Sequence, residues 1–286
     1  MKSYLSLIKF SHTVFALPFA LVGFTLGVLK TGSFNGQVLL LVLLCMIFAR
    51  SAAMAFNRYL DRNIDQANPR TANREIPAGV ISPKNALLFV IINCLLFIAT
   101  TWFINLLCFY LSPVSLIVVL GYSFTKRFTF LCHFVLGLGL SLAPIGAYLA
   151  MGGGFDLIPI LFSALVFVWV SGFDIIYALQ DEEFDKSNAL YSVPATIGKK
   201  SALRVSEGLH LICIVLLFFA VRALLANFSE FGWIIYLAAG IFSALLIYQH
   251  SLVRPNDLSR VNLAFFTTNG IASVIFGSLF ILDVLV

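Results

Sequence analysis

The chain has 286 residues, of which 60% are hydrophobic and only 11% are charged, and its net charge is +5 at pH 7. A soluble domain carries about 25% charged residues, so this composition excludes a soluble protein, and the apolar excess must face lipid. The five cysteines are scattered with no CxxC pair, which argues against a zinc site or a disulfide framework. Membrane orientation and attraction to anionic lipid headgroups explain the positive net charge, so we expect no nucleic-acid partner.

Nine apolar segments follow one another along the chain. A membrane-spanning helix needs about 20 mostly apolar residues, and such segments lie near residues 12–30, 36–56, 84–104, 106–123, 130–151, 157–178, 207–227, 231–250 and 263–285. The third and fourth run together through Asn105, where we expect a break. We predict an all-α bundle of nine transmembrane helices around a central cavity, in a single domain that covers residues 1–286.

The basic residues favour one side of the membrane. Of the 18 Lys and Arg, only Lys30 and Arg222 fall on one side of these segments, and the other 16 fall on the opposite side or at its helix ends. The positive-inside rule then predicts an integral inner-membrane protein with a cytoplasmic N-terminus. The same rule places two long connections, about 57–83 and 178–200, in the cytoplasm.

These two connections resemble each other. Asp61 and Asp65 are four residues apart, and Asp181 and Asp185 repeat that spacing 120 residues later. Each pair is followed by Pro-Ala and then by a Lys-x-Ala-Leu stretch. Four predicted spans separate the pairs, so both emerge on the same membrane face. Internal repeats in membrane bundles commonly surround a shared site, and we expect one here.

The paired carboxylates have a spacing that suits a helical stripe. Asn57 precedes Asp61 by four residues, and Tyr177 precedes Asp181 by four, so each set lies on one helix face. Like charges at this spacing destabilise a helix unless a cation lies between them. Asp174 lies inside an apolar span, where an ionisable residue is a functional candidate by default.

An isolated DxxxD at a helix end is usually solvated surface, and we assign the neighbouring Glu182 and Glu183 to that surface. The repeated pairs differ because oxygen ligands of this kind suit Mg²⁺, which typically takes one or two carboxylates plus substrate phosphates. The pattern therefore predicts Mg²⁺ between the two pairs with a bound diphosphate. Basic residues nearby can neutralise phosphate oxygens: Arg58, Arg62, Arg70, Arg74, Lys126 and Arg127. We assign Arg50, Lys199 and Arg204 to membrane orientation alone.

Four segments carry a family resemblance. Residues 57–65 read NRYLDRNID, residues 70–79 read RTANREIPAG, residues 122–129 read YSFTKRFT and residues 174–185 read DIIYALQDEEFD. In this order they resemble the motifs of the UbiA superfamily of intramembrane prenyltransferases, and the second resembles a segment of its 4-hydroxybenzoate branch. The resemblance covers most of the chain.

The resemblance implies a reaction and a set of residue roles. Diphosphate leaves an allylic polyprenyl diphosphate, and the ring carbon ortho to the hydroxyl of a small hydroxyaromatic acid attacks the cation that remains. The implied Mg²⁺ ligands are Asp61, Asp65, Asp181 and Asp185, which also count as catalytic with Asp174. The implied substrate-binding residues are Asn57, Arg62, Tyr122, Lys126, Arg127 and Tyr177.

Five of these residues have more specific expected roles. Arg62, Tyr122 and Lys126 are implied to contact the diphosphate. Arg127 is implied to bind the carboxylate of the acceptor, and Asp174 to orient the phenol or to receive a proton.

The acceptor has two candidates. The default is 4-hydroxybenzoate, for ubiquinone biosynthesis. Residues 8–18 resemble a subgroup associated with menaquinone, which makes a dihydroxynaphthoate the alternative. Prenylation of heme, of a chlorophyll precursor or of a lipid fits the RTANR and 174–185 segments less well. A cation-coupled transporter is the competitor from another class, but transporters usually place such acids near the bilayer midplane.

Overall fold

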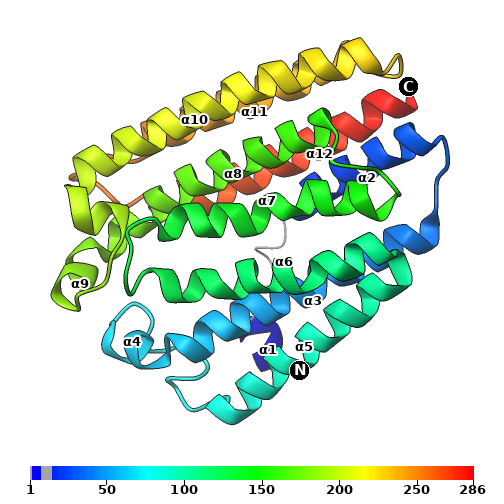
Figure 1. Cartoon of the computed structure of the whole chain (residues 1–286). Coiled ribbons are helices and arrows are strands. Elements are labelled where there is room, and N and C mark those ends of the chain that lie inside the picture. The colour runs from blue at the N-terminus through cyan, green and yellow to red at the C-terminus, as the bar shows by residue number, and fades with distance from the viewer. Residues whose placement is uncertain (1, 8–14) are drawn as a thin grey trace.

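The chain forms a bundle of long helices in the computed structural model, which describes residues 2–7 and 15–286 (Figure 1). Within these residues there is no β-strand, and eight helices are long and apolar enough to cross a membrane. They are α3 (Gly36–Leu60), α5 (Pro83–Ile104), α6 (Leu106–Thr125), α7 (Cys132–Ala150), α8 (Leu157–Ala178), α10 (Val193–Asn227), α11 (Ile234–Leu252) and α12 (Asn269–Leu285), the last preceded by the π-helix η3 (Leu263–Thr268). The chain is therefore an integral, multi-pass membrane protein.

The predicted count of nine spans is not confirmed. The first predicted span corresponds to α2 (Leu17–Thr31), an apolar helix of 15 residues that is shorter than the other eight. Its predicted first residues, 12–14, lie outside the described residues. The predicted break at Asn105 is confirmed, because this residue is extended (φ −166°, ψ 165°) and its side chain caps α6 by accepting a hydrogen bond from the Cys108 N–H.

The helices pack in two groups that meet at α2 and α7. Helices α3, α5 and α6 contact one another on one side, and α8, α10, α11 and α12 make up the other (Figure 1). Helix α7 packs against α6, α8 and α2, and so connects the groups. Two short helices, α4 (Arg62–Ala67) and α9 (Glu182–Ser187), lie at the same end of the bundle. The two predicted cytoplasmic connections therefore share one end.

The largest apolar core surrounds helix α8. Its buried Trp169 contacts the rings of Phe19 from α2 and Phe242 from α11. The indole N–H of Trp169 donates to Asn269 Oδ1 at 2.8 Å, and the Asn269 amide donates to two carbonyls of η3 at 2.9 Å. These bonds satisfy backbone groups that a π-helix presents differently from an α-helix, which explains a fully buried asparagine in an apolar core.

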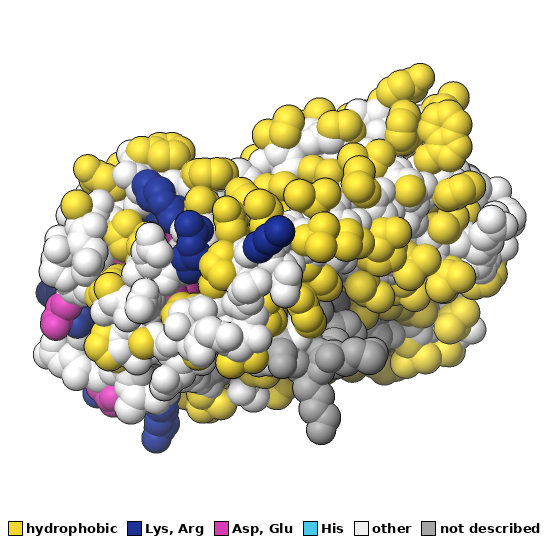
Figure 2. Space-filling model, turned by 90° about the horizontal axis from the view of Figure 1, so that it is seen from below, with side chains coloured by type: hydrophobic (Ala, Val, Ile, Leu, Met, Phe, Trp, Pro, Cys, Tyr) yellow, Lys and Arg dark blue, Asp and Glu magenta, His cyan; other side chains and the backbone are white. Residues whose placement is uncertain are grey.

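Charged side chains concentrate at one end of the bundle, and exposed aromatic side chains are present at the other. In Figure 2 the visible Lys, Arg, Asp and Glu side chains gather towards one end, and apolar side chains cover most of the remaining surface. At the helix ends away from Asp61, large aromatic side chains are exposed: Phe34, Trp102, Tyr110, Trp233 and Tyr236. Trp and Tyr concentrate where membrane meets water, so these residues agree with helices that cross a bilayer.

A close backbone contact between α2 and α7 generates a stability prediction. A Cβ on Gly23 would lie 1.9 Å from the Pro144 carbonyl oxygen, whereas a Cβ on Gly240 of α11 would meet no atom within 4 Å. Overpacking of this kind costs about 1–3 kcal/mol. We expect Gly23→Ala to lower the unfolding temperature in detergent and Gly240→Ala, the matched control, to leave it unchanged. Equal unfolding temperatures for both variants would contradict the close α2–α7 contact.

Candidate functional site

The first carboxylate pair lies where α3 passes into α4. Helix α3 ends at Leu60, and Asp61 is the residue between the two helices, with its N–H still bonded to the Asn57 carbonyl at 2.9 Å. The Asn57 amide donates to Asp61 Oδ2 at 3.1 Å. Asp61 and Asp65 are only 3% and 4% exposed. The predicted stripe of three oxygen-bearing side chains is thus present, although the helix breaks within it.

The second pair has the same relation to α8 and α9. Helix α8 ends at Ala178, and a 3₁₀ turn over Leu179–Asp181 leads into α9, which carries Asp185. Asp185 is buried, and the Asp181 side chain is 20% exposed. Both pairs therefore follow a membrane helix and precede or enter a short helix at the same end of the bundle.

Arg70 joins the two pairs. It follows the first pair in sequence, and its Nε and Nη2 donate to Asp181 Oδ1 and Oδ2 at 3.0 and 2.5 Å. Its Nη1 donates to the Tyr177 hydroxyl at 3.0 Å, and the Asn68 amide donates to Asp181 at 3.3 Å. Burial works to lower the pKa of Arg70, but the bonds to Asp181 and Tyr177 outweigh it and raise the pKa. The 57–83 connection and the end of α8 are thus in direct contact.

The end of α6 supplies two further cations. Arg127 Nη2 donates to Asp61 Oδ1 at 2.7 Å, and Lys126 Nζ lies 3.6 Å from Asp61 Oδ2. Lys126 is also near enough to Asp185 for a favourable charge interaction. Arg127 donates as well to the carbonyls of Ser123 and Leu60. Lys126 therefore lies between the two carboxylate pairs, and Arg127 ties α6 to the end of α3.

Asp65 has one carboxylate oxygen without a hydrogen-bond partner among the described residues. Arg74 donates to its Oδ1 at 2.6 Å, but its buried Oδ2 has no hydrogen-bond partner among the described residues, and Arg58 Nη1 lies 3.9 Å away. Within the described chain, no three His, Cys, Asp or Glu side chains are grouped closely enough to hold a metal by themselves. A hard cation that takes further ligands from water and phosphate, as Mg²⁺ does, fits this donor set.

One predicted assignment is wrong, and the structure leaves another predicted role untested. Glu182 was expected to face water, but it is only 8% exposed and pairs with Lys186 at 2.5 Å and with Lys199 at 3.6 Å. That expectation is wrong because Lys199, from the kinked start of α10, reaches back to α9. Arg62 donates to the Tyr59 carbonyl at 2.7 Å and stacks on its ring. In the described structure it forms no ion pair with the four aspartates.

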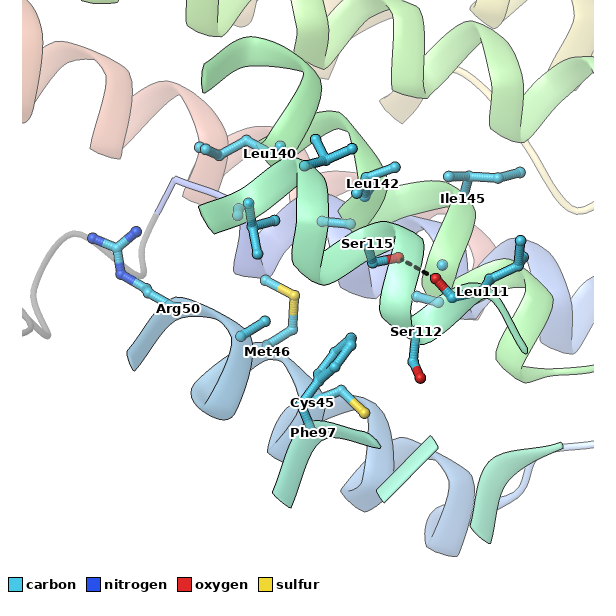
Figure 3. A pocket seen from close by; sticks show the side chains of 18 of the residues that line it. Cys45, Met46, Arg50, Phe97, Leu111, Ser112, Ser115, Leu140, Leu142 and Ile145 are labelled. Carbon is cyan, nitrogen blue, oxygen red and sulfur yellow. Dashed lines mark hydrogen bonds between the residues drawn. The ribbon is translucent and has the colours of Figure 1, made fainter. Parts of the chain in front are cut away.

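An apolar cavity of about 320 Å³ lies among the membrane helices. Helices α3, α5, α6 and α7 supply most of its walls, and Tyr122 is among the lining residues. Arg50 also lines it (Figure 3). Arg50 is the one charged side chain among the described lining residues, and its buried Nε has no hydrogen-bond partner there. Its place in the cavity wall was not expected from an assignment to membrane orientation alone. A signal was present, because Arg50 precedes Asn57 by seven residues and shares its helix face.

Asp174 has a partner that the sequence did not suggest. His133 Nδ1, from the first turn of α7, lies 2.7 Å from Asp174 Oδ2. Tyr122 also lies near Asp174. The predicted residue therefore lies close to the cavity lining, and His133 extends the set of polar groups there.

Comparison with known proteins gives consistent matches. The model of the UbiA prenyltransferase family matches residues 16–271. The 4-hydroxybenzoate octaprenyltransferase of Aliivibrio salmonicida is 31% identical over 242 residues, which are 84% of this chain and 82% of that protein. The protein of the same name from a strain of Aliivibrio fischeri is 32% identical over the same shares.

Solved structures match over nearly the whole chain. The apo structure of a UbiA homolog from Aeropyrum pernix K1 has a TM-score of 0.84 and 32% identity, and covers 95% of this chain and 98% of its own. A UbiA homolog from Archaeoglobus fulgidus, bound to GPP and Mg²⁺, has a TM-score of 0.76 and 24% identity, with 99% and 100% covered. The second likeness concerns the fold alone.

The pairing of Asp65 and Asp181 with basic groups predicts cooperative ligand binding. Mg²⁺ alone has to compete with Arg70 and Arg74 for Asp181 and Asp65, whereas pyrophosphate gives those arginines new partners. A ligand that binds the folded state raises its stability. We expect Mg²⁺ with pyrophosphate to raise the unfolding temperature by more than the two separate shifts combined. Additive shifts, or an unaltered response in Asp181→Asn, would contradict this arrangement.

Proposed function

The chain belongs to the UbiA prenyltransferase family, and we propose that it transfers a polyprenyl group from polyprenyl diphosphate to a ring carbon of 4-hydroxybenzoate in respiratory quinone biosynthesis. One observation carries the proposal. Four aspartates, three of them paired with basic side chains, lie at one end of the bundle, near an apolar cavity whose described lining residues include a single charged side chain. This suits a substrate with an anionic head and a long apolar tail.

The polar end binds the diphosphate head. In this proposal Asp61, Asp65, Asp181 and Asp185 hold a divalent cation, taken to be Mg²⁺, and Asn57 orients Asp61. When bound, Mg²⁺ neutralises charge that develops on the departing diphosphate. The Mg²⁺ and GPP in the Archaeoglobus fulgidus homolog support this choice. The predicted orientation puts this end in the cytoplasm.

The basic side chains at this end bind the phosphate oxygens of the diphosphate. Arg70, Arg74 and Lys126 neutralise aspartates in the structure, and each is free to turn to the diphosphate once a cation replaces it. Tyr122 is near both Asp61 and Asp174, between the head and the cavity. The role of Arg62 at the diphosphate stays a prediction, since its side chain lies on Tyr59.

The cavity accommodates the prenyl tail and excludes water. Its walls are mostly aliphatic, so an allylic cation formed beside it is shielded from hydrolysis. The C–O bond to the diphosphate breaks with its electron pair on the leaving group, and the ring carbon ortho to the hydroxyl bonds to the allylic carbon. Loss of the ring proton restores aromaticity.

Arg50 is the better candidate for the carboxylate of the acceptor. Arg127, which the sequence resemblance favoured, is engaged by Asp61 and two backbone carbonyls. Arg50 lies in the cavity with an unpaired buried Nε, and such a group is unfavourable unless an anion or acceptor approaches it. A dihydroxynaphthoate, the alternative acceptor, also carries a carboxylate. The resemblance that favours this acceptor lies in residues 8–18, and residues 8–14 are outside the described residues.

A transfer assay tests the function. Purified protein, Mg²⁺, a polyprenyl diphosphate and either acceptor are incubated, and the prenylated product is identified by mass spectrometry. We expect the 4-hydroxybenzoate product, and a loss of turnover of about 10²-fold or more in Asp181→Asn. Glu183→Gln is the matched control, because its side chain is 92% exposed, and it should retain full turnover. Absence of diphosphate release in every mixture would overturn the proposal in favour of a transporter.

The acceptor assignment predicts a selective effect of Arg50→Met. A hydrogen bond to a charged group contributes about 1.5–3 kcal/mol, so we expect KM for 4-hydroxybenzoate to rise about 10–100-fold while KM for the prenyl diphosphate is unchanged. A phenol without a carboxylate should show no such penalty. If Arg127→Met raises KM for 4-hydroxybenzoate and Arg50→Met does not, the carboxylate binds Arg127 instead.

A further inference from the structure

A buried histidine links three helices beside the proposed reaction centre. His133, from α7, is 3% exposed, and its Nδ1 lies 2.7 Å from Asp174 Oδ2 on α8. Its other ring nitrogen, Nε2, accepts a hydrogen bond of 3.3 Å from the backbone N–H of Val193, the first residue of α10. Both nitrogens therefore have a defined partner, and the ring orientation is set from two sides.

These partners determine which nitrogen carries the proton. A backbone N–H can only donate, so His133 Nε2 must be an unprotonated acceptor. In the neutral ring the proton is then on Nδ1, and Nδ1–H donates to Asp174 Oδ2. Two N–H groups would otherwise point at each other across the bond to Val193. The histidine thus holds one oxygen of Asp174 and leaves the other, Oδ1, without a hydrogen bond among the described residues.

The position of Asp174 suits a group that acts on the bound ring. It precedes Asp181 by seven residues, which on a helix is roughly 10 Å deeper in the membrane. It is near Tyr122, which lines the cavity. The Asp174 side chain is 21% exposed, whereas the His133 side chain is only 3% exposed. Asp174 therefore lies between the diphosphate end and the cavity, where the proposed reaction joins tail and ring.

We propose that His133 is a positioning residue that holds Asp174 as the proton acceptor of the transfer. The inference rests on the proposed function. After the allylic carbon bonds to the ring, the C–H bond at that ring carbon breaks, its electron pair returns to the ring, and Asp174 Oδ1 takes the proton. His133 keeps its own proton throughout and fixes the carboxylate through Oδ2.

Two substitutions separate this role from simple anchoring of α10. The side-chain amide of Asn places its N–H₂ where His has Nδ1, so His133→Asn keeps a donor to Asp174 and loses the contact with Val193. Gln places its amide where His has Nε2, so His133→Gln keeps a partner for the Val193 N–H and loses the donor to Asp174. The two variants remove one contact each.

We expect turnover to follow the donor to Asp174. A misplaced catalytic group can lower the rate about 100-fold, so His133→Gln should lower kcat by about that factor with KM for both substrates little changed, and His133→Asn should retain much more of kcat. With acceptor deuterated ortho to its hydroxyl, His133→Gln should show a larger isotope effect on kcat than the unsubstituted protein. Asp174→Asn should lower kcat at least as far, and the double variant Asp174→Asn with His133→Gln no further.

The outcomes distinguish this inference from the proposed function. If the unsubstituted protein transfers no prenyl group, the proposed function fails. If it does, and the Asn and Gln variants lose kcat equally together with unfolding temperature, His133 is only an anchor and the inference is overturned. An unchanged isotope effect in His133→Gln overturns it as well. His210→Gln serves as control for a buried histidine between the same α8 and α10, since His210 Nε2 contacts the Trp169 carbonyl at 3.1 Å; its kcat should stay near that of the unsubstituted protein.

Discussion

The structure depends on charge neutralisation at one end of an apolar bundle. Asp61 and Asp65 are almost fully buried, and a buried charge without a partner is strongly destabilising. Their counter-charges come from different parts of the chain: Arg74 from the following loop, and Lys126 and Arg127 from the end of α6. The ion pairs that hold these helix ends together are therefore the same groups that we propose to bind cation and diphosphate. Stability and ligand binding share one set of charges.

A second consequence is a gradient of polarity along the helices. The carboxylates lie at the bundle end, and Asp174, Tyr122 and Arg50 lie deeper, towards a cavity whose walls are otherwise mostly aliphatic. Because the low-dielectric surroundings strengthen each remaining polar interaction, a few groups suffice to orient a ring. The hydrogen bond of His133 to Asp174 and the unpaired Nε of Arg50 both belong to this deeper region.

Where the sequence-based predictions and the structure differ, the differences have one physical origin. Spans and short motifs are local, whereas the partner of a charged side chain is decided by distant segments. Glu182 lies in an exposed-looking acidic run, but Lys199 approaches it from α10. In the sequence, Arg50 looks like a basic residue that sets the membrane orientation, but in the structure it lines a cavity between four helices. The first of the nine predicted spans corresponds to the shorter α2, so the count of nine is not confirmed.

By itself, the sequence determined the all-helical membrane fold, the break at Asn105 and the two carboxylate stripes, because hydropathy and helical periodicity act over neighbouring residues. Family membership could also be read from the four motif segments. Only the tertiary structure decided that Arg70 donates hydrogen bonds to Asp181, 111 residues further along the chain. It also decided that Lys126 lies between the two carboxylate pairs and that His133 contacts Asp174. Those contacts join side chains far apart in the chain, and their distances follow from how whole helices pack, which no local pattern encodes.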